Sequence, residues 1–314
     1  MRKFIKRLKA RTALNKNAMK VYTVLRILVI LTAVRCFLTG NYESMMLCIL
    51  SLILFLLPSF FEQLLKVEIP GVFQIIIYAF IYAAEILGEV NKYYTAIPGW
   101  DTMLHTLNGF LCAAIGMSLI AILNRSNPNL KLSPFYMAMA AFCFSMTVGV
   151  IWEFIEFTAD SFFYLDMQKD FIVTAIGSVT LDETNSQIPV YVGNITRTVI
   201  ETQDGTTYVV NGGYLDIGII DTMKDLMVNF LGAVVFSTIG YFYEKKLLKD
   251  ETLNEGEQKF AGGLLIKPLS DDEIELTNQL IDEEMSREGR KLALVRRKKD
   301  ENRGAENIAP SEDA

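Results

Sequence analysis

The stretch that decides the fold is residues 44–57, SMMLCILSLILFLL, which carries no charged side chain. Continued to residue 64, it reaches the roughly 20 mostly apolar residues that a helix needs to cross a bilayer core about 30 Å thick. Comparable apolar stretches recur along the chain, at residues 20–39, 70–88, 101–123, 134–160 and 220–243. We therefore predict an all-α integral membrane protein with about six transmembrane helices.

Charged and apolar residues are segregated along the chain. It is 51% hydrophobic and 21% charged, and its mean hydropathy of +0.29 is high for a soluble protein with this much charge. We divide it into a basic N-terminus, five spans, an insert, a sixth span and a charged tail, at residues 1–19, 20–163, 164–219, 220–243 and 244–314. The net charge of −6 averages these unlike regions, and we expect no nucleic-acid partner.

Lysine and arginine residues indicate how the spans are oriented. Short cytoplasmic loops are enriched in these residues. They occur at the N-terminus, in the loops after the second and fourth spans and at the exit of the sixth span, whereas residues 40–43 have none and residues 89–100 have only Lys92. We therefore expect both termini to be cytoplasmic and residues 164–219 to be extracytoplasmic.

Two segments outside the spans have recognisable patterns. Residues 164–219 are predicted to form a small β insert, because Ile195–Thr202 and Thr206–Val210 are rich in strand-forming residues and Asp204-Gly205 favours a turn between them. The tail is predicted to contain a helix from about residue 271 to residue 299. We expect the tail to be peripheral to the membrane bundle.

Three of the predicted helices carry a stripe of polar residues at one end. Ionisable groups in a membrane-spanning helix are costly, so they usually face the bundle interior and mark function. Each stripe follows helical spacing, and with the expected orientation all three lie in the same outer layer, about 10–12 Å deep. The stripes are Asp101, His105 and Asn108 on the fourth span, Glu153, Glu156 and Asp160 on the fifth, and Asp221, Asp225 and Asn229 on the sixth, with Glu85 at the outer end of the third.

Three interpretations of this cluster remain open. In the first, Asp101, Asp221 and Asp225 bind a divalent metal ion (Mg²⁺, Mn²⁺, Ca²⁺ or Zn²⁺) that activates water or polarises a substrate. In the second, the acids form a cation or proton pathway, although the inner half of the spans has no comparable acidic stripe. In the third, the cluster is structural: Asp101 and Asp221 cap their helices, and the other residues form hydrogen bonds across the bundle.

The metal interpretation gives each residue a role. His105, Glu153 and Glu156 are the candidate catalytic residues; the two glutamates are also candidate ligands, and His105 is a ligand or a general base. The remaining polar residues of the site are Asn108, Asn229, Asp160 and Glu85. The two asparagines would orient water or substrate. The sequence contains no H-E-x-x-H, G-x-S-x-G, P-loop or Rossmann glycine pattern.

The three stripes carry a family resemblance. The strings Asp101-Thr-Met-Leu-His105, Trp152-Glu153-Phe-Ile-Glu156 and Asp221-Thr-Met-Lys-Asp225-Leu-Met-Val-Asn229 resemble the YjdF-like family of uncharacterised bacterial membrane proteins, over roughly residues 20–245. More distantly, the chain is similar to the VanZ-like proteins, which have an Asp-x-x-x-His helix and a later Asp-x-x-x-Asn-x-x-Gly helix. It departs from them in its Glu-x-x-Glu helix, its β insert and its long tail. The resemblance implies a bacterial cytoplasmic-membrane protein and, on the VanZ side, a connection to the cell envelope. Our leading hypothesis is a metal-dependent enzyme or binding site that faces the outside, and its expected partners are the lipid bilayer and an envelope or lipid-linked substrate.

Overall fold

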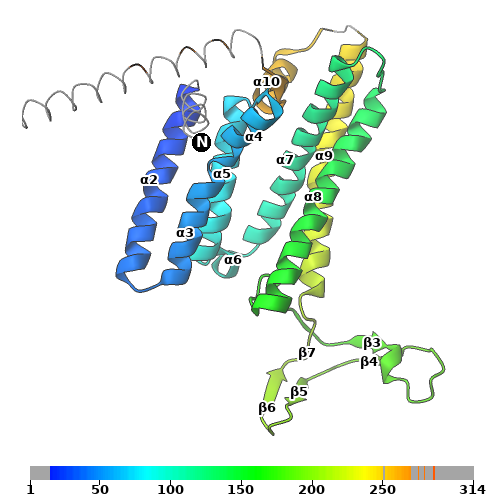
Figure 1. The fold of residues 1–314 in the computed structure, drawn as a ribbon. Coiled ribbons are helices and arrows are strands. Elements are labelled where there is room, and N and C mark those ends of the chain that lie inside the picture. The colour runs from blue at the N-terminus through cyan, green and yellow to red at the C-terminus, as the bar shows by residue number, and fades with distance from the viewer. Residues whose placement is uncertain (1–14, 250–251, 270–274, 276–278, 280–285, 287–314) are drawn as a thin grey trace, which may run out of the picture. The chain divides into compact units, whose positions relative to one another are not determined.

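The computed structural model describes residues 15–249 and 252–269, together with residues 275, 279 and 286. In this part of the chain six helices are long and apolar enough to cross a membrane, which confirms the predicted number of spans. The first three are Lys16–Leu38 (α2), Tyr42–Leu65 and Gly71–Val90. The second of these consists of α3 (Tyr42–Leu54) and α4 (Leu57–Leu65), and the third consists of α5 (Gly71–Ile81) and a π-helix (Tyr82–Val90). The last three are Trp100–Ser126 (α7), Pro134–Phe163 (α8) and Ile219–Leu248 (α9) (Figure 1). The protein is thus a mainly helical polytopic membrane protein.

The described residues fall into two compact units. The first unit comprises the described parts of Met1–Lys92 and Gln258–Ala314, and the second comprises those of Tyr93–Glu257. The first unit therefore contains the first three spans. The second contains a short helix, Tyr93–Ala96 (α6), the last three spans and the insert. All the predicted site residues on the fourth, fifth and sixth spans belong to the second unit.

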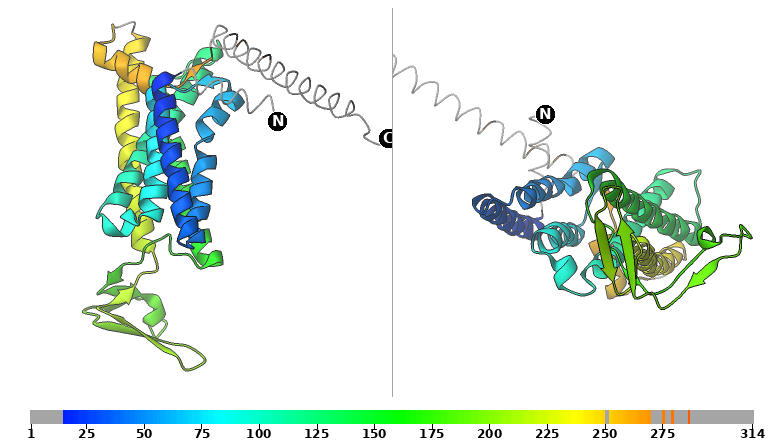
Figure 2. Two further views of the ribbon diagram at one scale, coloured as in Figure 1. Left: turned by 90° about the vertical axis from the view of Figure 1, so that its left-hand side faces the viewer. Right: turned by 90° about the horizontal axis from the view of Figure 1, so that it is seen from below.

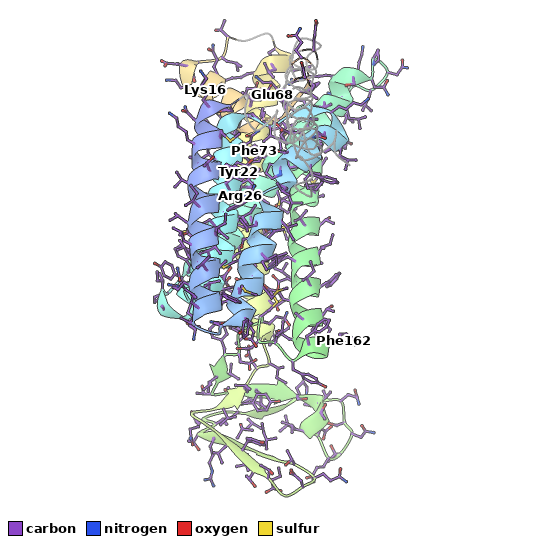
Figure 3. All side chains as sticks on the ribbon, turned by 60° about the vertical axis from the view of Figure 1, so that its left-hand side comes forward. Lys16, Tyr22, Arg26, Glu68, Phe73 and Phe162 are labelled. Carbon is purple, nitrogen blue, oxygen red and sulfur yellow. The ribbon has the colours of Figure 1, made fainter. Side chains whose placement is uncertain are left out.

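Aromatic side chains form the core of the first unit. Tyr78 on α5 is fully buried, and its ring centroid lies 5.3 Å from that of Tyr22 on α2 and 5.9 Å from that of Phe55 at the end of α3. Figure 3 shows Tyr22 one turn before Arg26 on α2, and the Arg26 guanidinium donates a hydrogen bond to the Tyr22 hydroxyl (2.5 Å). These contacts pack the three spans of this unit against one another.

The third span departs from a regular α-helix. Gln74 and Tyr78 are buried on α5, but from Tyr82 the chain continues as a π-helix. A π-helix closes its hydrogen bonds over five residues, so side chains on one face recur at a wider interval than in an α-helix. Glu85 lies on this π-helical segment and is partly buried. Its position therefore does not follow from the α-helical spacing used to place it.

Residues 258–269 of the tail are part of the first unit. Helix α10 (Glu255–Leu264) leads into β8 (Lys267–Pro268), which pairs antiparallel with β1 (Val67–Glu68) after the second span. Leu265 and Ile266 are each only 8% exposed. The expectation of a peripheral tail is therefore wrong for this part, because it adds a strand and two apolar side chains to the unit. The predicted helix at 271–299 lies almost wholly outside the described residues.

In the second unit α7, α8 and α9 run side by side, and each contacts the other two (Figure 1). Glycines allow the closest approach: a Cβ added at Gly109 would lie 2.1 Å from the backbone oxygen of Asn229, and one added at Gly232 would lie 2.0 Å from that of Thr106. From α8, the Ser145 hydroxyl donates a hydrogen bond to the carbonyl oxygen of Gly109 (2.7 Å). Small residues let helices associate closely in membranes, where no hydrophobic effect drives them together.

Between α8 and α9 the chain forms the predicted β insert, which extends beyond the ends of these helices (Figure 2). The expected hairpin is confirmed: Arg197–Glu201 (β5) pairs with Thr207–Asn211 (β6), and Gly205 in the turn has a φ of +84°. The other antiparallel pairs are Ile172–Val173 (β2) with Tyr214–Leu215 (β7) and Ile176–Ser178 (β3) with Val190–Val192 (β4), and a 3₁₀ turn, Val179–Leu181, follows β3. The insert is therefore a set of two-stranded ribbons.

Reporter fusions test the expected orientation of the spans. A fusion at residue 130, between α7 and α8, and one at the C-terminus are expected to read cytoplasmic, whereas a fusion near residue 190 in the insert should read external. The reason is the excess of lysine and arginine at the N-terminus and in alternate loops. A cytoplasmic reading from the insert fusion would reverse the orientation and move the polar cluster to the inner side of the membrane.

Candidate functional site

Both helices that begin at the polar cluster follow a glycine in the left-handed conformation. Gly99 (φ +78°) is the N-cap residue of α7 and Gly218 (φ +77°) is that of α9, so neither helix has a side-chain hydrogen bond from its N-cap residue. Asp101 and Asp221 lie inside the first turns of these helices, where the positive end of the helix dipole favours a carboxylate. The interpretation that these aspartates cap their helices is therefore wrong, because glycine occupies both N-cap positions.

His105 forms the centre of the site. Its Nε2 lies 3.4 Å from Asp101 Oδ1 and 3.8 Å from Asp225 Oδ2, and its Nδ1 lies 3.9 Å from Glu153 Oε1. These residues come from all three helices of the second unit, and the histidine is only 9% exposed. The last turns of α8 therefore lie beside the first turns of α7 and α9, and the three polar stripes meet at the imidazole.

Two carboxylate oxygens of this cluster are buried without a hydrogen-bond partner among the described residues. They are Asp225 Oδ1 and Glu153 Oε2. Asp225 is 1% exposed and Glu153 is 5% exposed. Burying a carboxylate is costly unless donors or a positive charge compensate it. The space beside His105 therefore favours a cation or another positively polarised group.

Glu156 and the two asparagines have partners in the protein. The Trp152 indole Nε1, one turn earlier on α8, donates a hydrogen bond to Glu156 Oε1 (2.8 Å). Asn108 Nδ2 donates to Asn229 Oδ1 (3.2 Å), which joins α7 to α9. Asn229 is 1% exposed, and a Cβ added at Gly149 of α8 would lie 2.7 Å from its Nδ2. The asparagine pair therefore lies where the three helices are in contact, about one turn further along α7 and α9 than His105 and Asp225.

Asp160 and Asp221 hold the root of the β insert. Asp160 accepts hydrogen bonds from the backbone N–H groups of Met167 (2.7 Å) and Gln168 (2.8 Å), and Asp221 accepts one from that of Lys169 (2.8 Å). These bonds satisfy both carboxylates and fasten the insert to the helix ends that carry the site. Of the predicted site residues, these two therefore have a structural role, because they bind the backbone of the insert.

The structure adds two residues that sequence reasoning missed, and one predicted site residue belongs to the other compact unit. Asp216 accepts hydrogen bonds from the N–H groups of Phe171 (2.5 Å) and Ile220 (2.9 Å), so it ties the insert to the start of α9. The sequence signal that could have identified Asp216 was its position two residues before Gly218, where α9 begins. The signal for Trp152 was its i, i+4 spacing to Glu156. Glu85 lies in the first unit.

The geometry around His105 brings together three candidate ligand atoms for one divalent ion. One ligand atom each from Asp101, His105 and Asp225 lies within 4.8 Å of the other two. Two atoms bound to one ion at about 2.1 Å are about 3.0 to 4.2 Å apart, and both distances from Nε2 fall in this range. Glu153 Oε1 lies 3.9 Å from the opposite ring nitrogen, which is beyond hydrogen-bond distance. Asp221, the third predicted ligand, does not belong to this group of atoms.

Comparison with known proteins identifies a family. Residues 20–246 match the family described as predicted membrane protein (DUF2238), so the match reaches from α2 into α9. No curated protein and no solved structure matches the chain. The resemblance to the YjdF-like and VanZ-like proteins stays a prediction.

Proposed function

We propose that this chain, which belongs to the DUF2238 family of predicted membrane proteins, binds a divalent metal ion between α7, α8 and α9. The observation that carries the proposal is the convergence of Asp101, His105 and Asp225, with an oxygen of Asp225 buried and unpartnered. Two buried carboxylates so close together repel each other, and a divalent ion bound between them would compensate both charges. One imidazole with carboxylate oxygens suits Mg²⁺, Mn²⁺ or Zn²⁺, and Ca²⁺ would add further oxygen ligands.

The bound ion would give the site a chemical use. A divalent ion polarises a carbonyl or phosphoryl oxygen, or activates a water molecule. With the orientation expected from the sequence, the site opens to the outside of a bacterial cytoplasmic membrane and acts on an envelope or lipid-linked substrate. Glu156, which the Trp152 indole holds, and Glu153 are the acid–base candidates, and Asn108 and Asn229 orient water or substrate.

A second candidate function is a scaffold without bound metal. It is favoured by Asp160 and Asp221, whose carboxylates bind the backbone of the insert. In that case the acid-rich layer exists to hold the insert at the helix ends, and His105 supplies the compensating charge when protonated. This alternative predicts no response to divalent ions.

Metal removal and addition test the proposal in the full-length protein. The metal content of the purified protein is measured first, and thermal unfolding of the chelator-treated protein is then followed with Mg²⁺, Mn²⁺, Ca²⁺ and Zn²⁺. A ligand at 100 times its Kd that binds only the folded state adds about 2.7 kcal/mol of stability. We expect at least one ion to raise the Tm in a concentration-dependent way. A flat response to all four ions, with no co-purifying metal, would exclude the metal site in favour of the scaffold.

A further inference from the structure

A short segment at the root of the β insert joins the ends of two helices. Residues 167–171, which we call the strap, follow α8 and lead into β2. Asp160 near the end of α8 accepts hydrogen bonds from two backbone N–H groups of the strap (2.7 and 2.8 Å). Asp221 in the first turn of α9 accepts a third, from the N–H group of Lys169 (2.8 Å). The strap is therefore tied to both helices by carboxylates.

Side chains of the strap pack against the beginning of α9. The Gln168 amide Nε2 donates a hydrogen bond to the Thr222 hydroxyl (2.5 Å). The Lys224 Nζ lies 5.6 Å from the centroid of the Phe171 ring, which is a cation–π contact. The strap also passes so close to Gly218 that a Cβ added there would lie 2.7 Å from Gln168 Cβ. The strap thus lies directly against the first turns of α9.

The strap covers one side of the polar site. The polar stripes of α8 and α9 both start at its attachment points, Asp160 and Asp221, and continue along the two helices to the His105 cluster. Asp221 is only 5% exposed, although it is the third residue of its helix, and Asp225 one turn further is 1% exposed. On the side of α7, by contrast, the Asp101 side chain is 30% exposed. The α8–α9 side is therefore the closed side of the site, and the strap lies across it.

The chain that leaves the insert is held in an unfavourable backbone conformation beside the strap. Ile217 has a φ of +58°, in the left-handed region that a β-branched residue rarely adopts, and its side chain is 76% exposed, so packing does not compensate for this conformation. Such strain persists only where surrounding contacts impose it. Here Asp216 accepts hydrogen bonds from the Phe171 N–H group of the strap (2.5 Å) and from that of Ile220 (2.9 Å). Release of the strap would let Ile217 relax, so the strain favours an open form.

We propose that the strap is a lid, which opens to admit a substrate to the polar site and closes over it when tied to Asp160 and Asp221. This inference rests on the proposed function, because the lid controls access to the proposed metal site. Lids exclude water from the reacting groups, and a few loop residues absorb the change in backbone angles when they move. Tyr164 and Ile217 are such positions here, because they flank the strap with φ values of +55° and +58°.

The single histidine of the chain makes the lid testable. The full-length, chelator-treated protein is exposed to diethyl pyrocarbonate, which reacts with neutral imidazole, and the modified His105 peptide is quantified over time by mass spectrometry. Asp160→Asn should raise the modification rate on the order of tenfold, the change that 1.4 kcal/mol of opening free energy produces. The reason is that an amide turns an N–H group toward one of the two N–H donors that the carboxylate binds. Asp182→Asn is the matched control and should leave the rate unchanged, because Asp182 accepts backbone hydrogen bonds elsewhere in the insert.

Ile217→Gly tests the lid in the opposite direction without changing any charge. Glycine adopts positive φ values at no steric cost, so the closed form gains stability and the modification of His105 should slow several-fold. A rate in Ile217→Gly that equals or exceeds the wild-type rate would overturn the proposal. So would an unchanged rate in Asp160→Asn, or an equal acceleration in Asp182→Asn, which would describe a general loosening of the insert.

The cation-dependent rise in Tm, measured on the same variants, keeps the two proposals apart. Unchanged His105 rates in a protein that responds to divalent ions refute the lid alone. An absent cation response in the wild type, together with the expected changes in the His105 rates, refutes the metal site and leaves the lid.

Discussion

Gly232→Ala is expected to lower the Tm strongly and to disrupt the polar site. The added Cβ would lie 2.0 Å from the backbone oxygen of Thr106 and 2.8 Å from the backbone nitrogen of Phe110. Both neighbours are backbone atoms of α7, so α9 must move away from α7 to accommodate the methyl group. Overpacking of this kind costs about 1–3 kcal/mol and occasionally more. The same helix contact holds His105 near Asp225, so the cation response should weaken as well.

Gly240→Ala is the matched control on the same helix. Its added Cβ would lie 2.4 Å from Met117 Cε, which is the end of a flexible side chain and can turn aside. Thermal unfolding of both variants in the same detergent should therefore show a much smaller loss for Gly240→Ala. Equal Tm values for the two variants would mean that α7 and α9 do not approach closely at Gly232.

Asp225→Asn is expected to abolish the rise in Tm that the divalent ion produces. In the proposed metal site Asp225, the most buried of the clustered carboxylates, would supply a ligand oxygen, and an amide is a much weaker cation ligand. Without metal, this variant should be at least as stable as the wild type, because the substitution removes repulsion from Asp101 and Glu153. Under the scaffold function, Asp225→Asn lowers the Tm and divalent ions change nothing.

Glu244→Gln provides the control for this second experiment. Glu244 is also buried on α9, at the helix end away from the site, and its Oε1 lies 3.0 Å from the Arg125 guanidinium. The Arg125 side chain is 60% exposed, so we expect the variant to lose at most about 1 kcal/mol. Its cation response should equal that of the wild type. If Glu244→Gln removes the response as fully as Asp225→Asn, the effect does not arise at the His105 cluster.

The membrane spans were predictable because the bilayer imposes a local rule. Each spanning helix must satisfy its own backbone hydrogen bonds and present about 20 apolar residues. Both properties can be read within one segment, and all six predicted spans are present. The β5–β6 hairpin was predictable for the same reason, since Asp204-Gly205 and its flanking residues lie close together in the sequence.

Three features of the structure were not predicted, and the first of them depends on a contact between distant segments. The pairing of β8 with β1 joins the tail to the loop after the second span, and nothing in the tail sequence identifies that partner. The π-helix at Tyr82–Val90 follows no turn or proline signal, so an α-helical interval was assumed for Glu85. One of the three interpretations had Asp101 and Asp221 cap their helices, whereas glycines with positive φ occupy both N-cap positions.

The sequence alone determined that three helices carry polar stripes, because helical periodicity places residues three, four and seven apart on one face. Only the tertiary structure decided how each acid is used. The close contacts at Gly109 and Gly232 hold α9 against α7, and this brings Asp225 to His105. The hydrogen bond from Ser145 to Gly109 holds α8, which carries Glu153, against α7. The backbone of the insert meanwhile binds Asp160 and Asp221. Periodicity defines the face of a helix, but packing decides what that face meets.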